Sequence, residues 1–451
     1  MSKTRSIRDK SGYLELILTI VIAFILSLPI LSYITNNAVG HRQDQMFIYG
    51  FFISAGICTA LVAIKFVSII FEHKLLTFSA KLKLIVTKNL DYLLFFVYII
   101  WIFISICYNG FTRVNVLGLS FKREGLITFT LYVFIFFAAS FIKKEKYKTF
   151  LAIVFALGAI VLAILGVYVN MSANPQEMAE KVLLSGSIGV FSNYNHHGYY
   201  LAMTGSLMLA LAVFLKTLWW RITFFFGFVL TYIYVLYLTS IGALVSLEMG
   251  MLLVCIIYAV ISKDIKHKII AIFGAILTVA LFFIVTKAET PISDKADNFV
   301  DQTSKVAVGQ AEDSFGTNRI LLWKATVDFI KEKPVFGWGS DGIWYELEKI
   351  SSEAQRTHNE YLQQTAFYGI PAGLCYVFGC FMVYWRALRN RKNLRPCDIA
   401  FLSGSFAYLV GAFFGVTMVQ VYPMFMAALG LSMTENSSAR VSYVNTNAIK
   451  K

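Results

Sequence analysis

The stretch IIAIFGAILTVALFFIVT, residues 269–286, is a continuous apolar run with no charged side chain. Its length is close to the roughly 20 residues that an α-helix needs to cross the hydrocarbon core of a bilayer. Similar runs occur at residues 14–31 (LELILTIVIAFILSLPIL) and 93–107 (LLFFVYIIWIFISIC). The whole chain is 58% hydrophobic and 15% charged, whereas about a quarter of the residues in a soluble domain are charged. The sequence therefore predicts an all-α, polytopic membrane protein.

The apolar segments predict about twelve transmembrane helices. We place them at residues 13–35, 46–71, 90–108, 125–142, 149–169, 199–215, 222–239, 241–261, 269–286, 365–385, 399–417 and 419–433. Residues 1–286 then hold the first nine and residues 363–435 the last three, which leaves a large polar segment at 287–362 and a tail at 436–451. We see no internal repeat of two halves, which argues against several common transporter architectures.

The net charge of +14 could indicate binding to nucleic acid, but the distribution of Lys and Arg favours a membrane topology instead. If the N-terminus is cytoplasmic, most basic residues fall in cytoplasmic segments. The short outer loops then hold only Arg42, Arg113, Lys122, Arg123 and Lys181. This asymmetry is the positive-inside pattern. We therefore predict a protein of the cytoplasmic membrane that contacts lipid and no nucleic acid, with both termini in the cytoplasm and the large polar segment outside.

The segment THNEYL, residues 357–362, places a histidine just before an apolar stretch. Thr357 and Glu360 have the spacing of a capping box, with Thr as the N-cap and Glu as the third helical residue. His358 would then be the first residue of a helix that continues into the tenth span. The positive end of the helix dipole disfavours an imidazolium, so we expect a neutral imidazole that can accept a proton. A surface histidine that merely fits the first turn is the alternative.

The large polar segment is expected to contain short amphipathic helices. Residues 288–316 should be loop or weak helix. Thr317 or Asn318 then caps a helix whose apolar residues follow helical spacing and which ends at Pro334. A glycine-rich turn follows, and the apolar residues within 343–350 predict a second helix.

Four basic residues on the predicted outer face are candidates for binding phosphate. Arg113, Lys122 and Arg123 lie in one short loop, against the positive-inside trend, and Arg319 begins the capped helix of the large segment. The planar guanidinium suits bidentate binding of phosphate. Ordinary solvation or contact with lipid headgroups is the alternative for each residue taken alone.

A second outer loop, FSNYNHHG at residues 191–198, carries amides and imidazoles directly before a span. Asn193 and Asn195 suit a hydroxyl-rich ligand. An interfacial belt of Tyr199 and Tyr200 with a capping Asn is the alternative. Adjacent histidines on a helix chelate a metal poorly, and no metal-binding motif occurs elsewhere, so we predict no metal site.

Three other polar residues give competing interpretations. Asp44, in the first outer loop, could be a catalytic carboxylate. Lys65 and Glu248 fall inside spans and could mark an ion path. Lys65 could instead extend its ammonium to the membrane surface, and Glu248 could hydrogen-bond within the bundle.

Together these motifs resemble the bacterial O-antigen ligase and polysaccharide polymerase family, over roughly residues 110–433. One part of the resemblance is KREGL at 122–126, and another is FSNYNHHG at 191–198. The third part is a series in the C-terminal third: Asn318, Arg319, Trp323, Pro334, Gly337, Gly339, His358, Asn359, Tyr361, Leu362 and Gly369. One departure is TSIG at 239–242, where family members often have a Ser-Arg pair, so one expected arginine is absent.

The resemblance implies a GT-C-like fold and a glycosyltransferase without a cofactor or metal. The donor would be a glycan linked to undecaprenyl diphosphate, and the acceptor a hydroxyl of a glycan or lipid-glycan at the outer face of the bacterial cytoplasmic membrane. His358 would be the general base. The diphosphate would be held by Arg123, Arg319, Lys122 and Arg113. The glycan or acceptor would be contacted by Asn193, Asn195, Asn359 and Tyr361.

Two reactions share this chemistry. A ligase transfers the glycan to a different acceptor, such as a lipid A–core sugar, and a polymerase transfers it to another repeat unit. The single His motif in one large outer loop favours the ligase. A lipid-linked glycan flippase would need a charged cavity through the membrane, whereas the polar residues concentrate on the outer face. A non-catalytic scaffold predicts that His358→Ala leaves surface glycan unchanged.

Overall fold

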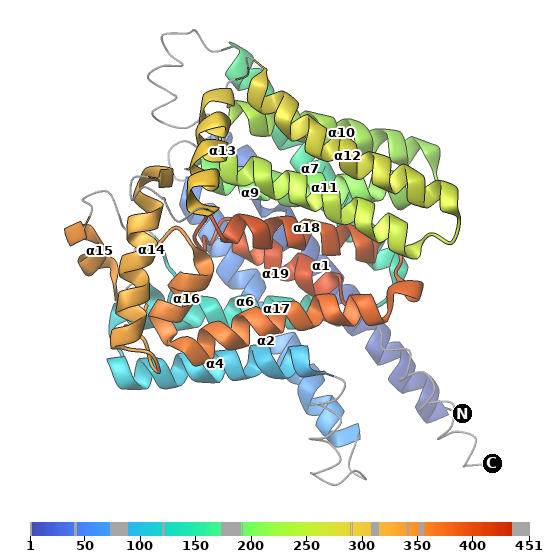
Figure 1. Ribbon diagram of the computed structural model, residues 1–451. Coiled ribbons are helices and arrows are strands. Elements are labelled where there is room, and N and C mark those ends of the chain that lie inside the picture. The colour runs from blue at the N-terminus through green and yellow to red at the C-terminus, as the bar shows by residue number, and fades with distance from the viewer. Residues whose placement is uncertain are drawn as a thin grey trace.

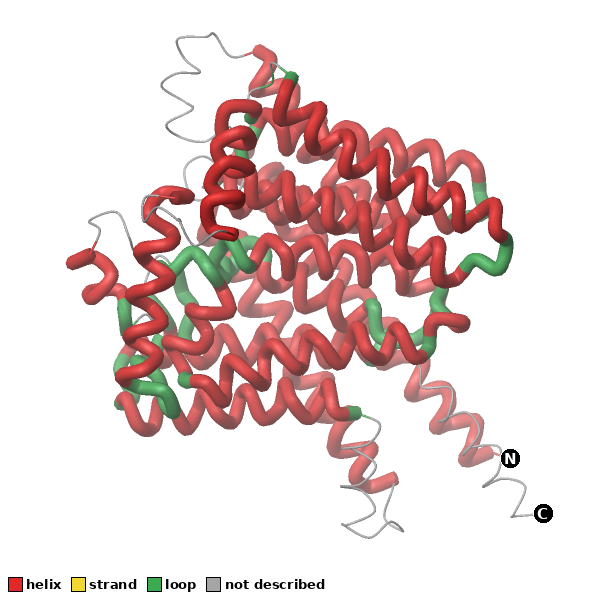
Figure 2. The backbone as a smooth tube through the Cα atoms, in the orientation of Figure 1, coloured by secondary structure: helices red, strands yellow, loops and turns green. Residues whose placement is uncertain are grey.

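A computed structural model describes residues 2–39, 43–72, 89–119, 122–172, 191, 193–288, 290, 292–307, 315–340, 342–350 and 356–434. All regular structure in these residues is helical (Figure 2). The helices are α1 (Ser2–Val39), α2 (Gln43–Glu72), α4 (Leu90–Asn109), α5 (Arg113–Leu117), α6 (Leu126–Ser140), α7 (Glu145–Ser172), α9 (Tyr194–Phe214), α10 (Leu218–Tyr237), α11 (Ile241–Ile261), α12 (Ile265–Lys287), α13 (Ser293–Ala307), α14 (Phe315–Glu332), α15 (Trp344–Ile350), α16 (Glu360–Tyr368), α17 (Ile370–Arg389), the 3-10 helix η1 (Arg391–Asn393), α18 (Pro396–Ala412) and α19 (Tyr422–Leu431). The predicted tail at 436–451 lies outside the described residues.

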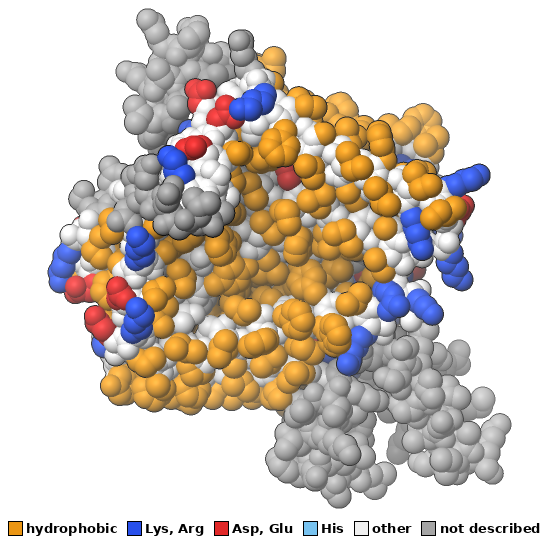
Figure 3. Space-filling view, in the orientation of Figure 1, with side chains coloured by type: hydrophobic (Ala, Val, Ile, Leu, Met, Phe, Trp, Pro, Cys, Tyr) orange, Lys and Arg blue, Asp and Glu red, His pale blue; other side chains and the backbone are white. Residues whose placement is uncertain are grey.

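Nine of the described helices are long and apolar enough to cross a membrane: α1, α2, α4, α7, α9, α10, α11, α12 and α17. Three shorter apolar helices, α6, α18 and α19, fall in the fourth, eleventh and twelfth predicted segments. The protein is an all-helical, multi-pass membrane protein, as the sequence predicts, and the figure of about twelve crossings stays a prediction. Apolar side chains cover the flank of the bundle seen in Figure 3, and the charged side chains in that view lie mainly toward its two ends.

Close helix packing places α9 at the centre of the bundle. This helix packs against α18, α10 and α11, while α4 packs against α17 (Figure 1). A Cβ on Gly198 of α9 would lie 2.4 Å from the Cβ of Ala243, and a Cβ on Gly250 would lie 2.0 Å from the Oγ of Ser206. Small residues of this kind let helices approach closely inside a membrane.

The tenth predicted span, 365–385, is not a single helix. α16 ends at Tyr368, Gly369 takes a φ of 88°, and α17 begins at Ile370. The cause is steric, because a Cβ on Gly369 would lie 1.9 Å from the carbonyl oxygen of Val335. The amide of Ile370 also donates to the carbonyl of Pro334 at 2.7 Å. The chain therefore turns here, and α16 lies at one end of the bundle beside α14 (Figure 1).

The helices of the large polar segment gather at that same end. We call it the loop end, since it carries α13, α14, α15 and α16, and call the other the opposite end (Figure 1). Within the stretch expected to be loop or weak helix, Ser293–Ala307 form α13. The predicted cap of the next helix is wrong, because α14 already begins at Phe315, before Thr317 and Asn318. The predicted second helix is present as α15.

Candidate active site

His358 lies in a tight turn directly before α16, and the predicted capping box is wrong. The N-cap of α16 is Asn359, whose Oδ1 accepts from the amide of Leu362 at 3.1 Å. Thr357 closes the turn by donating from its hydroxyl to the carbonyl of Asn359 at 2.9 Å. The cap moves because Asn is at least as good an N-cap as Thr, and Glu360 has buried partners elsewhere. His358 is left outside the helix with a φ of 49°.

The half-buried imidazole of His358 is surrounded by cationic side chains. Burial, followed by the positive charges of Arg319, Lys122 and Arg356, lowers the pKa of His358 from 6.5 to about 4. Each of these effects disfavours the imidazolium. His358 is therefore neutral at neutral pH, as expected, but burial and neighbouring cations replace the helix dipole as the cause.

A buried ion pair that the sequence analysis missed holds the His358 turn to the loop before α6. Arg356 Nη1 lies 2.5 Å from Glu124 Oε2, and both side chains are almost fully inaccessible. Breaking a buried pair leaves an uncompensated charge, which typically costs about 3–5 kcal/mol. Glu124 stands inside the KREGL motif and Arg356 lies two residues before His358, but nothing in the sequence links the two residues to each other.

The loop before α6 carries two of the predicted phosphate ligands, Lys122 and Arg123. Lys122 is buried and interacts electrostatically with His358. Arg123 has a φ of 54°, and its Nε is buried without a hydrogen-bond partner among the described residues. Arg113 differs, because it is exposed at the start of α5, and no contact in the described part of the chain links it to His358. The structure thus links Lys122 to His358, and Arg123 lies next to Lys122 in the same loop.

Arg319, the third predicted phosphate ligand, reaches the site from α14. It interacts electrostatically with both His358 and Tyr199. Its Nε is also buried without a partner in the described residues. The ring of Trp323, one turn further along α14, packs on Phe413 with 5.2 Å between ring centroids. A helix anchored to the bundle in this way fixes the position of the guanidinium.

The first turn of α9 also lies near His358. Asn193 caps α9 by accepting from the amide of Asn195 at 2.8 Å, and Asn195 Oδ1 accepts from the hydroxyl of Ser240 at 2.7 Å. His196 interacts electrostatically with His358 and Arg356. The two histidines of the HH pair therefore differ, because His197 is buried and stacks on Phe191 with a centroid separation of 4.4 Å. The alternative interpretation of this segment is right about a capping Asn, which is Asn193, and wrong about an interfacial tyrosine belt, since Tyr199 and Tyr200 are buried.

Asn359 and Tyr361, predicted to contact the glycan or acceptor, are engaged in holding α16. Asn359 is the cap described above, and the Tyr361 hydroxyl donates to the carbonyl of Leu409 at 2.6 Å. Glu360 is fully buried between them and accepts from the hydroxyls of Tyr376 and Tyr408, the latter at 2.8 Å. This network fixes the helix that follows His358.

Four non-glycine residues of the described chain have a clearly positive φ: Arg123 (54°), Thr239 (52°), Asn318 (64°) and His358 (49°). A strained backbone of this kind costs on the order of 1–3 kcal/mol per residue and clusters at functional sites. All four lie at the loop end, on segments that the sequence analysis singled out. The TSIG segment, which lacks the expected arginine, is the turn between α10 and α11 that contains Thr239.

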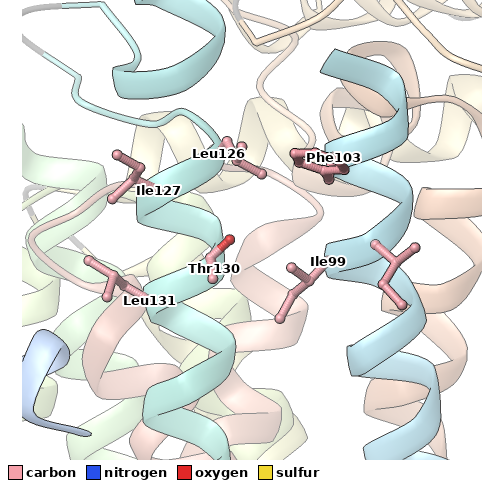
Figure 4. A pocket seen from close by; sticks show the side chains of 7 residues that line it. Ile99, Phe103, Leu126, Ile127, Thr130 and Leu131 are labelled. Carbon is pink, nitrogen blue, oxygen red and sulfur yellow. The ribbon is translucent and has the colours of Figure 1, made fainter. Parts of the chain in front are cut away.

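An open apolar pocket of about 430 Å³ lies between α4 and α6 (Figure 4). Its lining consists of Ile99, Ile100, Phe103, Leu126, Ile127, Thr130 and Leu131. In Figure 4 Ile99 and Phe103 point toward α6, while Leu126 and Thr130 point toward α4. Because Leu126 is the first residue of α6, the pocket begins directly after the loop that carries Lys122 and Arg123.

Lys65 and Glu248, the two residues within predicted spans that could mark an ion path, do not form a joint site. Lys65 lies on α2, which packs against α1 and α6, whereas Glu248 lies on α11, which packs against α9, α12 and α18. The Tyr232 hydroxyl donates to Glu248 at 2.5 Å, so this carboxylate hydrogen-bonds within the bundle. The side chain of Asp44 lies outside the described ones. In the described residues, no three His, Cys, Asp or Glu side chains are grouped to hold a metal ion.

Comparison with models of protein families matches residues 226–377 to the family described as O-antigen ligase. The matched range includes Arg319 and His358 but not the loop of Lys122 and Arg123. No curated protein matches the chain.

Proposed function

We propose that the chain is a metal-independent glycosyltransferase of the O-antigen ligase family, whose model matches residues 226–377, with ligase- or polymerase-type glycan transfer as its activity. The donor is a glycan linked to undecaprenyl diphosphate, and the acceptor is a hydroxyl of a second glycan or lipid-glycan. The observation that carries this proposal is the neutral, half-buried His358 beside Arg319 and Lys122. A neutral base next to cations suits a reaction that removes a proton beside a departing anion.

The cations of the site bind the diphosphate in this proposal. Arg123 and Arg319 each have a buried Nε without a described partner, and a buried donor left unpaired is costly. A phosphate oxygen would satisfy both groups with charge-assisted hydrogen bonds. Lys122 adds positive charge near His358. These groups also stabilise the charge that grows on the diphosphate as it departs.

His358 is the general base. It accepts the proton of the acceptor hydroxyl while the hydroxyl oxygen forms a bond to the anomeric carbon of the donor. The bond between that carbon and the diphosphate oxygen breaks, and its electron pair leaves with undecaprenyl diphosphate. Attack from the face opposite the leaving group inverts the anomeric configuration.

The polyprenyl chain of the donor lies in the apolar pocket between α4 and α6. The pocket starts at Leu126, a few residues after Lys122 and Arg123. A ligand with a diphosphate head at these cations and an apolar tail would meet an apolar surface directly beside them. On the other wall, His196, Asn193 and Asn195 of α9 are placed to meet the acceptor, since His196 interacts electrostatically with His358.

The test is transfer by the purified protein in the presence of EDTA, with an undecaprenyl-diphosphate glycan and candidate acceptors. We expect transfer by the wild type, its loss in His358→Ala and a strongly reduced but measurable rate in Arg319→Ala. Product length distinguishes addition of one glycan, as in a ligase, from growth of a chain, as in a polymerase. Transfer by a folded His358→Ala variant at the wild-type rate would contradict the assignment of the base.

A further inference from the structure

Lys295 reaches from the first turn of α13 to the strained turn between α10 and α11. Its Nζ donates to Thr239 Oγ1 at 2.9 Å and to the Thr239 carbonyl at 3.5 Å. It also lies over the ring of Tyr194, 5.4 Å from the centroid. All of these partners are neutral. These contacts orient the exposed ammonium without placing a negative charge beside it.

Two other lysines near Lys295 in the sequence form ion pairs with carboxylates. Lys287 pairs with Asp297 at 2.9 Å, and Lys305 pairs with Asp301 at 3.0 Å. Within the described residues, no carboxylate lies within 4 Å of the Lys295 ammonium, although Asp294 is adjacent in sequence. Lys305, the other lysine of α13, thus pairs with a carboxylate, whereas the exposed Lys295 contacts neutral groups of the neighbouring turn and of α9.

α13 is packed firmly enough to fix this lysine. Ile292 and Ala296 are fully buried, and the ring of Phe299 packs on Phe414 with 5.9 Å between centroids. Phe299 lies four residues after Lys295, so both side chains project from the same face of α13. Lys295 therefore belongs to a docked surface of the helix.

The position of Lys295 is on the Arg319 side of the candidate site. Arg319 interacts electrostatically with Tyr199, and Tyr199 interacts with Tyr194, whose ring lies beneath Lys295. α14 and α13 dock on adjacent residues, Phe413 and Phe414, through Trp323 and Phe299. An anion held by Arg319 would thus approach a second, preplaced cation.

We propose that Lys295 is a donor-binding residue whose ammonium contacts a phosphate of the lipid-linked donor. This inference rests on the proposed function. A phosphate oxygen makes a stronger, charge-assisted hydrogen bond than a threonine hydroxyl does. The Thr239 hydroxyl holds the ammonium ready in the free protein, and the donor replaces it or joins it.

The test compares Lys295→Ala, Lys295→Arg and Thr239→Val in the full-length protein, with Lys305→Ala as a control on the same helix. For Lys295→Ala we expect KM for the donor to rise roughly tenfold, the usual effect of losing one charge-assisted hydrogen bond. KM for the acceptor should not change. Lys295→Arg should stay near the wild type, as should Lys305→Ala. Thr239→Val should have a small effect, because it keeps the cation.

A purely structural tether gives the opposite pattern, in which Thr239→Val matches Lys295→Ala and both lower the melting temperature of the free protein. That result would overturn the proposal, as would an unchanged donor KM in Lys295→Ala.

A binding measurement separates this inference from the proposed function. Undecaprenyl diphosphate, and inorganic diphosphate in a parallel arm, are titrated against thermal stability of the purified protein. If the wild type binds the lipid and Lys295→Ala binds it roughly tenfold more weakly, the residue contacts the diphosphate even if no acceptor is ever glycosylated. Equal binding by both proteins would refute the role of Lys295 while leaving glycan transfer standing. Weakening in the lipid arm alone would assign the contact to the lipid-linked phosphate.

Discussion

The two ends of the bundle differ in how their buried charged side chains are paired. At the opposite end, Lys148 Nζ lies 2.7 Å from Asp398 Oδ1 with both side chains inaccessible. Arg395 donates to the same carboxylate, and Arg386 makes two hydrogen bonds to Asp91 at 2.5 and 2.6 Å. At the loop end, the charges that act on His358 are those of Arg319, Lys122 and Arg356, all of them positive.

The loop end also has the strained backbone. None of the described residues of the opposite end has a positive φ among non-glycine residues, whereas Arg123, Thr239, Asn318 and His358 all lie at the loop end. Paired charge and relaxed backbone are what stability alone requires. Positive charge around His358 and backbone strain are what the proposed diphosphate site would require. The comparison therefore predicts that substitutions at the loop end change activity and those at the opposite end change stability.

The largest expected effect is on activity, from His358→Ala. A general base contributes roughly 10²- to 10⁴-fold to the rate, so we expect kcat to fall by that amount while the melting temperature stays near the wild-type value. His267→Ala is the matched control, since His267 is an exposed histidine of α12 whose ring lies 5.7 Å from that of Tyr258. If His358→Ala and His267→Ala were equally active, the loop end would not be the end whose substitutions change activity.

The second effect is on stability, from Asp398→Asn. Removing one partner of a buried pair should lower the free energy of unfolding by about 3–5 kcal/mol. Asp328→Asn is a sharp control, because Lys331 and Asp328 are also 2.7 Å apart but more than half exposed; exposed pairs contribute about 0–1 kcal/mol. Denaturation in detergent compares the two. A stable Asp398→Asn variant with lost transfer activity would show that the opposite end also serves function.

Much of the fold follows from the sequence, because membrane-spanning helices require long apolar runs that are visible without a structure. The site is only partly visible. His358, Arg319, Arg123 and Lys122 could be found from motifs and topology, but the partner of Arg356 could not, because a contact between residues 124 and 356 has no local signal.

The cap of α16 shows a different reason for failure. Thr357 and Asn359 both suit an N-cap, and sequence alone gave no ground to prefer the second. The burial of Glu360 by Tyr376 and Tyr408, from two later helices, decides where α16 begins. The missing arginine of the TSIG turn is similar, since only the fold brings Lys295 to that turn.

The third prediction concerns the pH profile of the reaction. His358 must be neutral to act as a base, and its pKa is lowered to about 4, so kcat/KM should fall only when the pH drops through about 4. Arg319→Ala removes a cation that disfavours the imidazolium, so the pKa should rise toward 6.5 and the acid limb should move to higher pH. The limb for kcat should also lie higher than that for kcat/KM, because bound diphosphate favours the imidazolium.

Lys331→Ala, an exposed lysine of the same helix, is the control for this shift. It should leave the limb in place. If the acid limb of kcat/KM is also unchanged in Arg319→Ala, His358 is not the group that titrates.

The smallest expected effect is on the pH dependence of stability, and it concerns Glu360. This buried carboxylate of the loop end is an exception to the comparison, because its partners are the hydroxyls of Tyr376 and Tyr408. Burial raises the pKa of Glu360 from 4.5 to about 7, although the hydroxyls of Tyr376 and Tyr408 oppose this. The folded state therefore holds a proton that the unfolded state has lost between these two pH values. The stability contributed by Glu360 is fully present below about pH 4.5 and declines as the pH rises toward 7, by at most about 1.4 kcal/mol per pH unit.

Glu360→Gln should abolish this slope, since an amide does not titrate in that range. The measurement is the melting temperature between pH 4.5 and 7.5, with Glu348→Gln as the control, because Glu348 is an exposed carboxylate of α15. Parallel curves for the wild type and Glu360→Gln would mean that Glu360 is ionised across the range. In that case a negative charge persists beside His358, and the positive surplus of the loop end is smaller than the comparison requires.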